Sequence, residues 1–93
     1  MESVVIQYRP KSYPAVEEAV LGALREGAVR VILDLAALDA LDTQGVRGLI
    51  TLLRRARALG GELALTSLKP DVRRTLQVTA LDRIFPLVEA EAA

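Results

Sequence analysis

The 93-residue chain contains no cysteine, no histidine and no tryptophan. Without cysteine, a disulfide framework, a thiolate nucleophile and a cysteine-based metal site are all excluded. Histidine is the commonest general acid or base and the commonest metal ligand, so its absence leaves only carboxylates, hydroxyls and lysines for catalysis. No P-loop and no GxGxxG motif is present. We therefore expect a protein that is not an enzyme and needs no cofactor.

The chain also lacks an excess of charge and any long apolar run. Its 12 basic and 12 acidic residues cancel, whereas a nucleic-acid binder needs a basic excess to displace counterions from phosphates. The apolar runs are only a few residues long, far below the roughly 20 needed to cross a bilayer. The N-terminus, M-E-S, is acidic and lacks the basic and apolar regions of a secretory signal. These features predict a cytoplasmic protein that neither binds nucleic acid nor inserts into a membrane.

The residues that are present favour an ordered core. The chain is 52% hydrophobic but only 3% aromatic, so leucine, valine, isoleucine and alanine must build that core. Intrinsic disorder needs low hydrophobicity and usually a large net charge, and neither applies here. Because 93 residues fall within the range of one domain, we expect a single domain over residues 1–93.

Four segments predict strands, at residues 3–8, 29–35, 62–66 and 84–88. The first is rich in β-branched and aromatic residues and is stopped by Arg9-Pro10. The second is nearly continuous in apolar residues, which suits a central strand covered on both faces. The last contains Pro86, which lacks an N–H group and is confined to an edge strand.

Three amphipathic segments between these strands predict helices. The first follows Ser12 as a candidate N-cap, carries Pro14 in its first turn and ends at Gly27. The second begins at Asp42, a strong N-cap, and stops at Gly60-Gly61. The third begins at Pro70. The side chains predicted to face the core are Val16, Ala19, Val20, Ala23 and Leu24 in the first helix, Val46, Leu49, Ile50 and Leu53 in the second, and Val72 and Leu76 in the third.

The resulting order is β-α-β-α-β-α-β, which predicts an α/β fold with a mostly parallel four-stranded sheet flanked by helices. In such folds, ligand-handling residues collect at the carboxyl ends of strands. The loop at residues 36–43 follows the predicted central strand, so it is the first place to look for a functional site.

Five short motifs occur in this order: V-I-L-D-L at 31–35, L-D-T-Q-G at 41–45, L-G-G-E-L at 59–63, K-P-D-V-R at 69–73 and L-D-R-I-F-P at 81–86. Each motif alone is common, but the five together at this spacing are specific. Over residues 29–88 the chain resembles the STAS domain of bacterial anti-sigma factor antagonists. The resemblance implies a STAS-like fold and a regulatory protein-binding module.

The resemblance also implies a site and a mechanism. In the family, the unmodified domain binds a serine kinase anti-sigma factor through a loop and helix that begin at an Asp-Ser/Thr-Ser/Thr-Gly motif, and phosphorylation there breaks the complex. The matching partner-binding positions are Asp42, Thr43, Gln44, Gly45 and Arg47, and Thr43 is the candidate phosphorylation site. A phosphate would add about −1.5 to −2 charges beside the carboxylate of Asp42.

Two departures from the family pattern bear on this mechanism. Gln44 stands where a second hydroxyl is common, and it cannot accept phosphate. If the acceptor position is 44, the domain is permanently unmodified; if it is 43, regulation survives, and the sequence leaves both open. Further, only one strand precedes the first helix, and R-P-K-S-Y at 9–13 replaces an acidic loop, which changes the charge presented to a kinase.

Structural explanations compete with these functional ones. As an N-cap, Asp42 contributes roughly 1 kcal/mol to the stability of the fold, whatever functional role it also has. Gly45 and Gly48 either allow a neighbouring strand to approach or leave a flat surface for a partner. Asp39, Asp42 and Asp82 lack the matching acidic pair of a magnesium site. The second helix has a basic face, which is either solvated or aimed at an acidic partner; its members are Arg47, Arg54, Arg55 and Arg57.

Two other functional classes compete with a regulatory binding module. A STAS domain of this size could be an accessory subunit of an ABC transporter for lipids, binding the transporter ATPase, and the fold would be the same. An enzyme would need a nucleophile with an adjacent base, and Thr43 beside Asp42 is too poor a pair without histidine or metal ligands. The sequence does not identify the partner, the oligomeric state or the process controlled.

Overall fold

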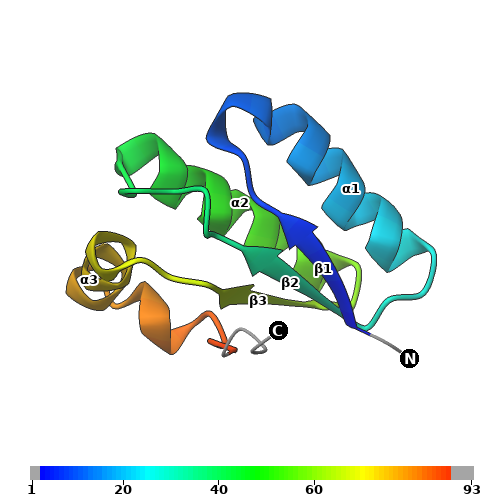
Figure 1. Ribbon diagram of the computed structural model, residues 1–93. Helices are drawn as coiled ribbons and strands as arrows, with labels where there is room; N and C mark the ends of the chain where they lie inside the picture. Colours follow the sequence, from blue (N-terminus) through cyan, green and yellow to red (C-terminus); the bar gives the residue numbers. More distant parts are fainter. Residues whose placement is uncertain (1–2, 89–93) are drawn as a thin grey trace.

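The computed structural model describes residues 3–88, so Met1, Glu2 and residues 89–93 of the expected single domain lie outside the description. Three parallel strands form one sheet in the order β1 (Ser3–Gln7), β2 (Arg30–Asp34) and β3 (Glu62–Thr66) (Figure 1). The register aligns the strands from end to end, with Ser3 beside Arg30 and Arg30 beside Glu62. The carboxyl ends of all three strands therefore lie at the same edge of the sheet.

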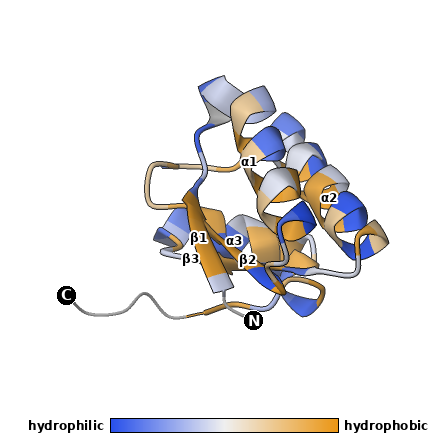
Figure 2. Ribbon diagram, turned by 90° about the vertical axis from the view of Figure 1, so that its right-hand side faces the viewer, coloured by the Kyte–Doolittle hydropathy of each residue, from blue (hydrophilic) through white to orange (hydrophobic). Residues whose placement is uncertain are grey.

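The helices are α1 (Tyr13–Arg25), α2 (Thr43–Ala58) and α3 (Pro70–Val78), with short 3-10 turns η1 (Pro10–Ser12) and η2 (Leu81–Arg83). Helices α1 and α2 pack side by side against one face of the sheet (Figure 2). Helix α3 and η2 lie at the β3 side, far from α1 (Figure 1). The predicted α/β fold is confirmed, and no helix of residues 3–88 has the length and apolarity needed to cross a membrane.

The core consists almost entirely of aliphatic side chains. Val31 and Leu33 of β2 and Leu63 of β3 are fully buried against the two helices. The predicted inward stripe of α1 is largely confirmed, since Val16, Val20 and Leu24 are buried; Ala19 is exposed, however, and Leu21 is buried instead. In α2 the buried residues are Leu49, Leu52, Leu53 and Ala56, whereas Val46 and Ile50 are only partly covered.

Strand β2 is central, as predicted, but it is not covered on both faces. Val31 and Leu33 are buried, whereas Arg30, Ile32 and Asp34 on the opposite face are only partly buried. The layer of α1 and α2 covers one side of the strand and leaves the other partly open to solvent. The prediction that the apolar run at residues 29–35 is covered on both faces is therefore wrong.

The predicted fourth strand at residues 84–88 is wrong. Leu87 forms a single parallel bridge with Leu65: the Leu65 N–H donates to the Pro86 carbonyl at 2.9 Å, and the Val88 N–H donates to the Leu65 carbonyl at 2.8 Å. Pro86 has no N–H to extend this pairing, and the turn that follows η2 occupies the preceding residues. The described sheet thus has three strands rather than four.

Most helix ends agree with the sequence signals, although the predicted cap at Ser12 is wrong, since its side chain makes no capping hydrogen bond. Gly27 after α1 and Gly60 after α2 have φ values of 109° and 79°, the left-handed conformation that favours glycine at a helix C-terminus. Pro70 is the first residue of α3, as predicted. Both glycines lie at the amino edge of the sheet, where α1 leads into β2 and α2 leads into β3, opposite the edge that carries the start of α2.

Candidate functional site

The start of α2 is held by a cap made within four residues. Asp42 is extended, and its Oδ1 accepts a hydrogen bond from the Gly45 N–H at 2.7 Å. Its carbonyl accepts the first helical bond, from the Val46 N–H at 2.9 Å. Aspartate is among the best N-caps because its oxygen satisfies an N–H that the helix leaves free. The predicted cap is confirmed, and it fixes the backbone of Thr43 and Gln44.

The predicted site residues are brought together at this helix start. Asp42, Thr43, Gln44 and Arg47 are exposed, and Gly45 is partly buried. A Cβ on Gly45 would lie 2.7 Å from Leu41 Cδ1, so glycine at this position lets the start of α2 pack closely against Leu41 of the preceding loop. The four exposed side chains therefore form a polar end of α2 that a partner can reach without any change of fold.

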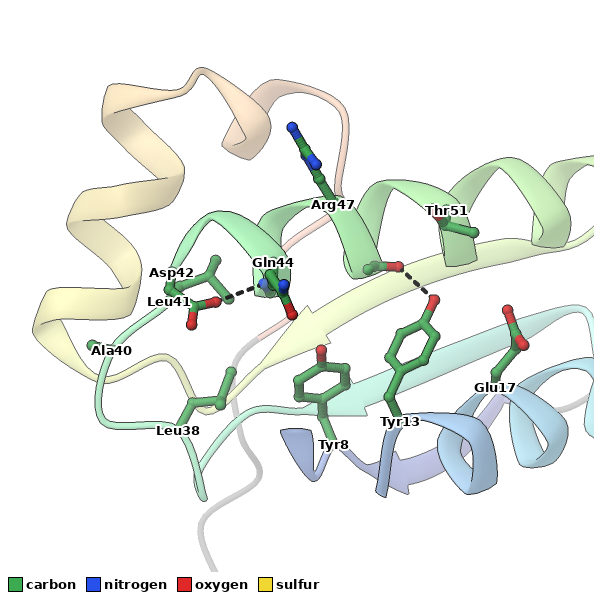
Figure 3. A pocket seen from close by; sticks show the side chains of 12 residues that line it. Tyr8, Tyr13, Glu17, Leu38, Ala40, Leu41, Asp42, Gln44, Arg47 and Thr51 are labelled. Atoms are coloured by element: carbon green, nitrogen blue, oxygen red, sulfur yellow. Dashed lines mark hydrogen bonds between the residues drawn. The ribbon is translucent and has the colours of Figure 1, made fainter. Parts of the chain in front are cut away.

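An open hollow of about 470 Å³ lies beside this helix start (Figure 3). Its walls come from three places that are far apart in the sequence: the end of β1, the start of α1, and the loop and first turns of α2. The lining side chains include Tyr8, Tyr13, Leu38, Leu41 and Gln44. Gln44 lines the hollow, whereas Thr43 does not.

Tyr13 joins α1 to α2 across this hollow. Its hydroxyl donates a hydrogen bond to the Gly48 carbonyl at 3.0 Å (Figure 3). A Cβ on Gly48 would lie 2.9 Å from Tyr13 Cε2, closer than side-chain atoms normally pack, so glycine permits this contact. The sequence offered close approach of a strand or a flat surface for a partner as the alternatives for Gly48; the nearest atoms are those of Tyr13 at the start of α1, followed by the hydroxyl of Tyr8, just after β1, at 3.5 Å.

Tyr8 forms the floor of the hollow. It is 2% exposed, and its hydroxyl makes no hydrogen bond with any residue between 3 and 88. Burial raises the pKa of Tyr8 above its usual value of 10.0, and Tyr13 and the carboxylate of Asp42 raise it further. The pKa of Tyr13 is raised by burial and by Glu17, and Arg55 partly opposes this. Both hydroxyls are therefore neutral well beyond neutral pH.

Sequence reasoning did not identify Tyr8, Tyr13, Leu38 or Leu41 as site residues. One signal was available, because the chain has only three aromatic residues and two of them are these tyrosines. They lie five positions apart, on either side of the turn that enters α1. That two of three aromatics flank one turn indicates a shared location, although it does not reveal what they face.

Charge is unevenly distributed although the total is zero. Residues 43–88 carry eight basic and three acidic side chains, whereas residues 3–42 carry four basic and six acidic ones. On α2, Arg47, Arg54 and Arg57 are exposed, while Arg55 lies 3.5 Å from Glu17 of α1. The predicted basic face of α2 is thus present, with one of its members directed to α1.

Two of the three carboxylates considered for a metal site, Asp39 and Asp42, have other partners. Asp39 pairs with Lys69 at 2.7 Å, and the hydrogen bond from this ammonium lowers the pKa of Asp39. Asp42 caps α2. Within the described part of the chain, no group of three or more carboxylates is arranged to hold a metal ion.

Comparisons with known proteins agree with this architecture. The family model described as STAS domain matches residues 11–93. BtrV of Bordetella bronchiseptica, named as an anti-sigma factor antagonist, is 36% identical over 77 residues, which are 82% of this chain and 66% of BtrV. The chain thus spans just under two thirds of that relative.

Three solved structures show the same fold. A variant of RsbS from Moorella thermoacetica, in which glutamate replaces a serine, is 26% identical, with a TM-score of 0.75 over 98% of this chain and 84% of its own. The anti-sigma factor antagonist SpoIIAA in its unphosphorylated form is 21% identical, with a TM-score of 0.72 over 97% and 81%. The phosphorylated form of SpoIIAA, from Bacillus, has a TM-score of 0.63 at 18% identity, over 96% and 79%. The chain belongs to the STAS domain family and is an anti-sigma factor antagonist-like STAS domain.

Proposed function

We propose that this domain is a non-catalytic regulatory module that binds a serine kinase anti-sigma factor through the start of α2. The contact residues are Asp42, Thr43, Gln44, Gly45 and Arg47. The observation that carries the proposal is the exposed polar end of α2, held rigid by the Asp42 cap at the carboxyl edge of the sheet. The similarity of the chain to BtrV and to the fold of SpoIIAA, both named as anti-sigma factor antagonists, supports the choice of partner.

We further propose that phosphorylation of Thr43 ends this binding. Thr43 is exposed and supplies the only hydroxyl between Asp42 and Gly45. It is the first residue of α2, where the helix dipole favours negative charge, so a phosphate there is compatible with the fold. A phosphate would still add about −1.5 to −2 charges to the contact surface, beside Asp42. We therefore expect the phosphate to weaken binding of the partner without destabilising the helix.

Two features of relatives support the choice of phosphorylation as the switch. SpoIIAA has been solved in unphosphorylated and phosphorylated forms. A variant of RsbS carries glutamate in place of a serine, a substitution that adds negative charge as a phosphate does. In this chain, Gln44 lines the hollow and cannot take phosphate, which leaves Thr43 as the acceptor. Neither the structure nor these relatives favours the alternative of an ABC transporter subunit.

The test is binding to the serine kinase anti-sigma factor encoded in the same genome, measured by calorimetry with and without ATP and magnesium. Thr43→Glu should weaken binding at least tenfold, and mass spectrometry should find phosphate on Thr43 after incubation with ATP. Gln77→Glu is the matched control, because it adds one negative charge at an exposed site on α3. Binding of the wild type that resists both ATP and Thr43→Glu would show a permanently unmodified antagonist.

A further inference from the structure

The hydroxyl of Tyr8 has no assigned role in the free domain. The tyrosine is 2% exposed, yet its hydroxyl finds no hydrogen-bond partner among residues 3–88. Among the described residues, the buried side-chain oxygen that lacks a partner is Thr66 Oγ1 and not the Tyr8 hydroxyl, so the Tyr8 hydroxyl opens into the hollow and water reaches it there. The hydroxyl is therefore free to hydrogen-bond a group that enters the hollow and displaces that water.

Figure 3 shows where that hydroxyl is directed. It points up from the residue that follows β1 into the hollow, toward Gln44 at the start of α2. The hollow is kept open by the contact of Tyr13 with Gly48 on one side and bounded by Leu38 and Leu41 on the other. A protein that lies over the exposed end of α2 would cover its mouth. The hollow is thus placed to receive a side chain from the same partner.

The charges around the hollow indicate what kind of side chain fits. The carboxylate of Glu17 already faces Arg55 at 3.5 Å, and Asp42 accepts a hydrogen bond from its own helix. Arg47 is the third charged residue of the lining, and its side chain points away from Tyr8 (Figure 3). The other lining residues are uncharged, with Gln44 and Thr51 as the polar side chains among them. Burying a charge there would be costly without a free opposite charge. An uncharged side chain whose tip can hydrogen-bond has no such cost.

We infer that the hollow takes up one uncharged side chain of the anti-sigma partner, with an amide or hydroxyl tip that hydrogen-bonds the Tyr8 hydroxyl. This inference rests on the proposed function and adds the second half of the binding site, at the end of β1. Interfaces draw most of their affinity from a few side chains buried in pockets, surrounded by contacts that exclude water. The exposed end of α2 then acts as the rim, and the hollow as the pocket.

Tyr8→Phe tests the inference directly, because it removes one oxygen and leaves the ring. In the free domain the hydroxyl has no protein partner, so the midpoint of urea unfolding should stay the same or rise. Affinity for the anti-sigma kinase should fall roughly three- to tenfold, the effect of one lost hydrogen bond at a covered site. A marked drop in stability would mean that the hydroxyl serves the fold, and it would overturn the inference.

A second pair of variants tests the hollow without touching Tyr8. Ala40 lines the hollow, and Ala37 is an exposed alanine of the same loop outside it. Ala40→Phe should fill part of the space and weaken kinase binding at least tenfold, while Ala37→Phe should bind like the wild type. If the wild type and Ala37→Phe bind and both Tyr8→Phe and Ala40→Phe bind equally well, the inference fails and the proposed function stands. If the wild type itself does not bind the kinase, the proposed function fails.

Discussion

The starts of α1 and α2 stand on two sides of the same hollow, but they are fixed in different ways. Helix α2 is capped by Asp42, whose carboxylate reaches the Gly45 N–H three residues on. Helix α1 follows Ser12, which makes no capping bond, and is held by the Tyr13 hydroxyl on the Gly48 carbonyl, 35 positions away. One helix start is specified locally and the other depends on the tertiary fold. The hollow therefore persists only while α1 and α2 remain packed together.

The contact between Tyr13 and Gly48 can be tested against a glycine in α1. A Cβ on Gly22 would meet no atom within 4 Å, so Gly22→Ala should gain the helix propensity of alanine, about 1 kcal/mol. Gly48→Ala gains the same propensity but places a Cβ 2.9 Å from the ring of Tyr13, and such overpacking costs about 1–3 kcal/mol. In urea unfolding, Gly48→Ala should therefore be less stable than Gly22→Ala by about that cost. Equal stabilities would show that the ring moves aside freely.

The two helix starts should also respond differently to loss of their N-cap side chains. Asp42→Ala removes the cap of α2 and should lower the free energy of unfolding by about 1 kcal/mol. Ser12→Ala removes a hydroxyl that makes no capping bond, so its effect should stay within about 0.5 kcal/mol. Urea unfolding of both variants measures the difference. A loss at Ser12 as large as that at Asp42 would contradict the assignment of a local cap to α2 alone.

This contrast explains how much the sequence could predict. Strand β3 was predicted with its observed bounds, and the cap at Asp42, the stop at Gly27 and the start at Pro70 were all correct. Each of these depends on a conformational preference or hydrogen bond within a few residues. Interactions of this kind involve neighbouring residues, so they can be predicted from the sequence alone.

The incorrect or missing predictions concern contacts between residues that are far apart in the sequence. The predicted last strand failed because Pro86 limits pairing with β3 to one bridge, a competition between distant segments. The hollow was not foreseen because Tyr8 and Tyr13 meet α2 only after the chain has formed two strands and two helices. The motif at Asp42 to Gly45 located half of the candidate site. The other half, on β1 and α1, has no motif of its own.

The smallest expected effect is on the ionisation of the two tyrosines. The pKa values of Tyr8 and Tyr13 are raised, so each hydroxyl holds its proton more tightly in the folded state than in the unfolded one. Their contribution to stability is complete below the unfolded pKa, about 10, and is lost as pH rises through the folded values. Since the chain has two tyrosines and no tryptophan, near-ultraviolet absorbance of tyrosinate follows these two groups alone.

The folded domain should therefore titrate with midpoints above about 10, and the urea-unfolded chain near 10. Tyr13→Phe should leave one titration, that of Tyr8, and should move it toward its ordinary value because the second cause of its shift is gone. Asp42→Ala should move it slightly in the same direction, because the Asp42 carboxylate is the third cause. Titration midpoints near 10 in the folded wild type would mean that water hydrates both tyrosine hydroxyls as fully as in the unfolded chain. The packing of α1 against α2 would then not shield the hollow from water.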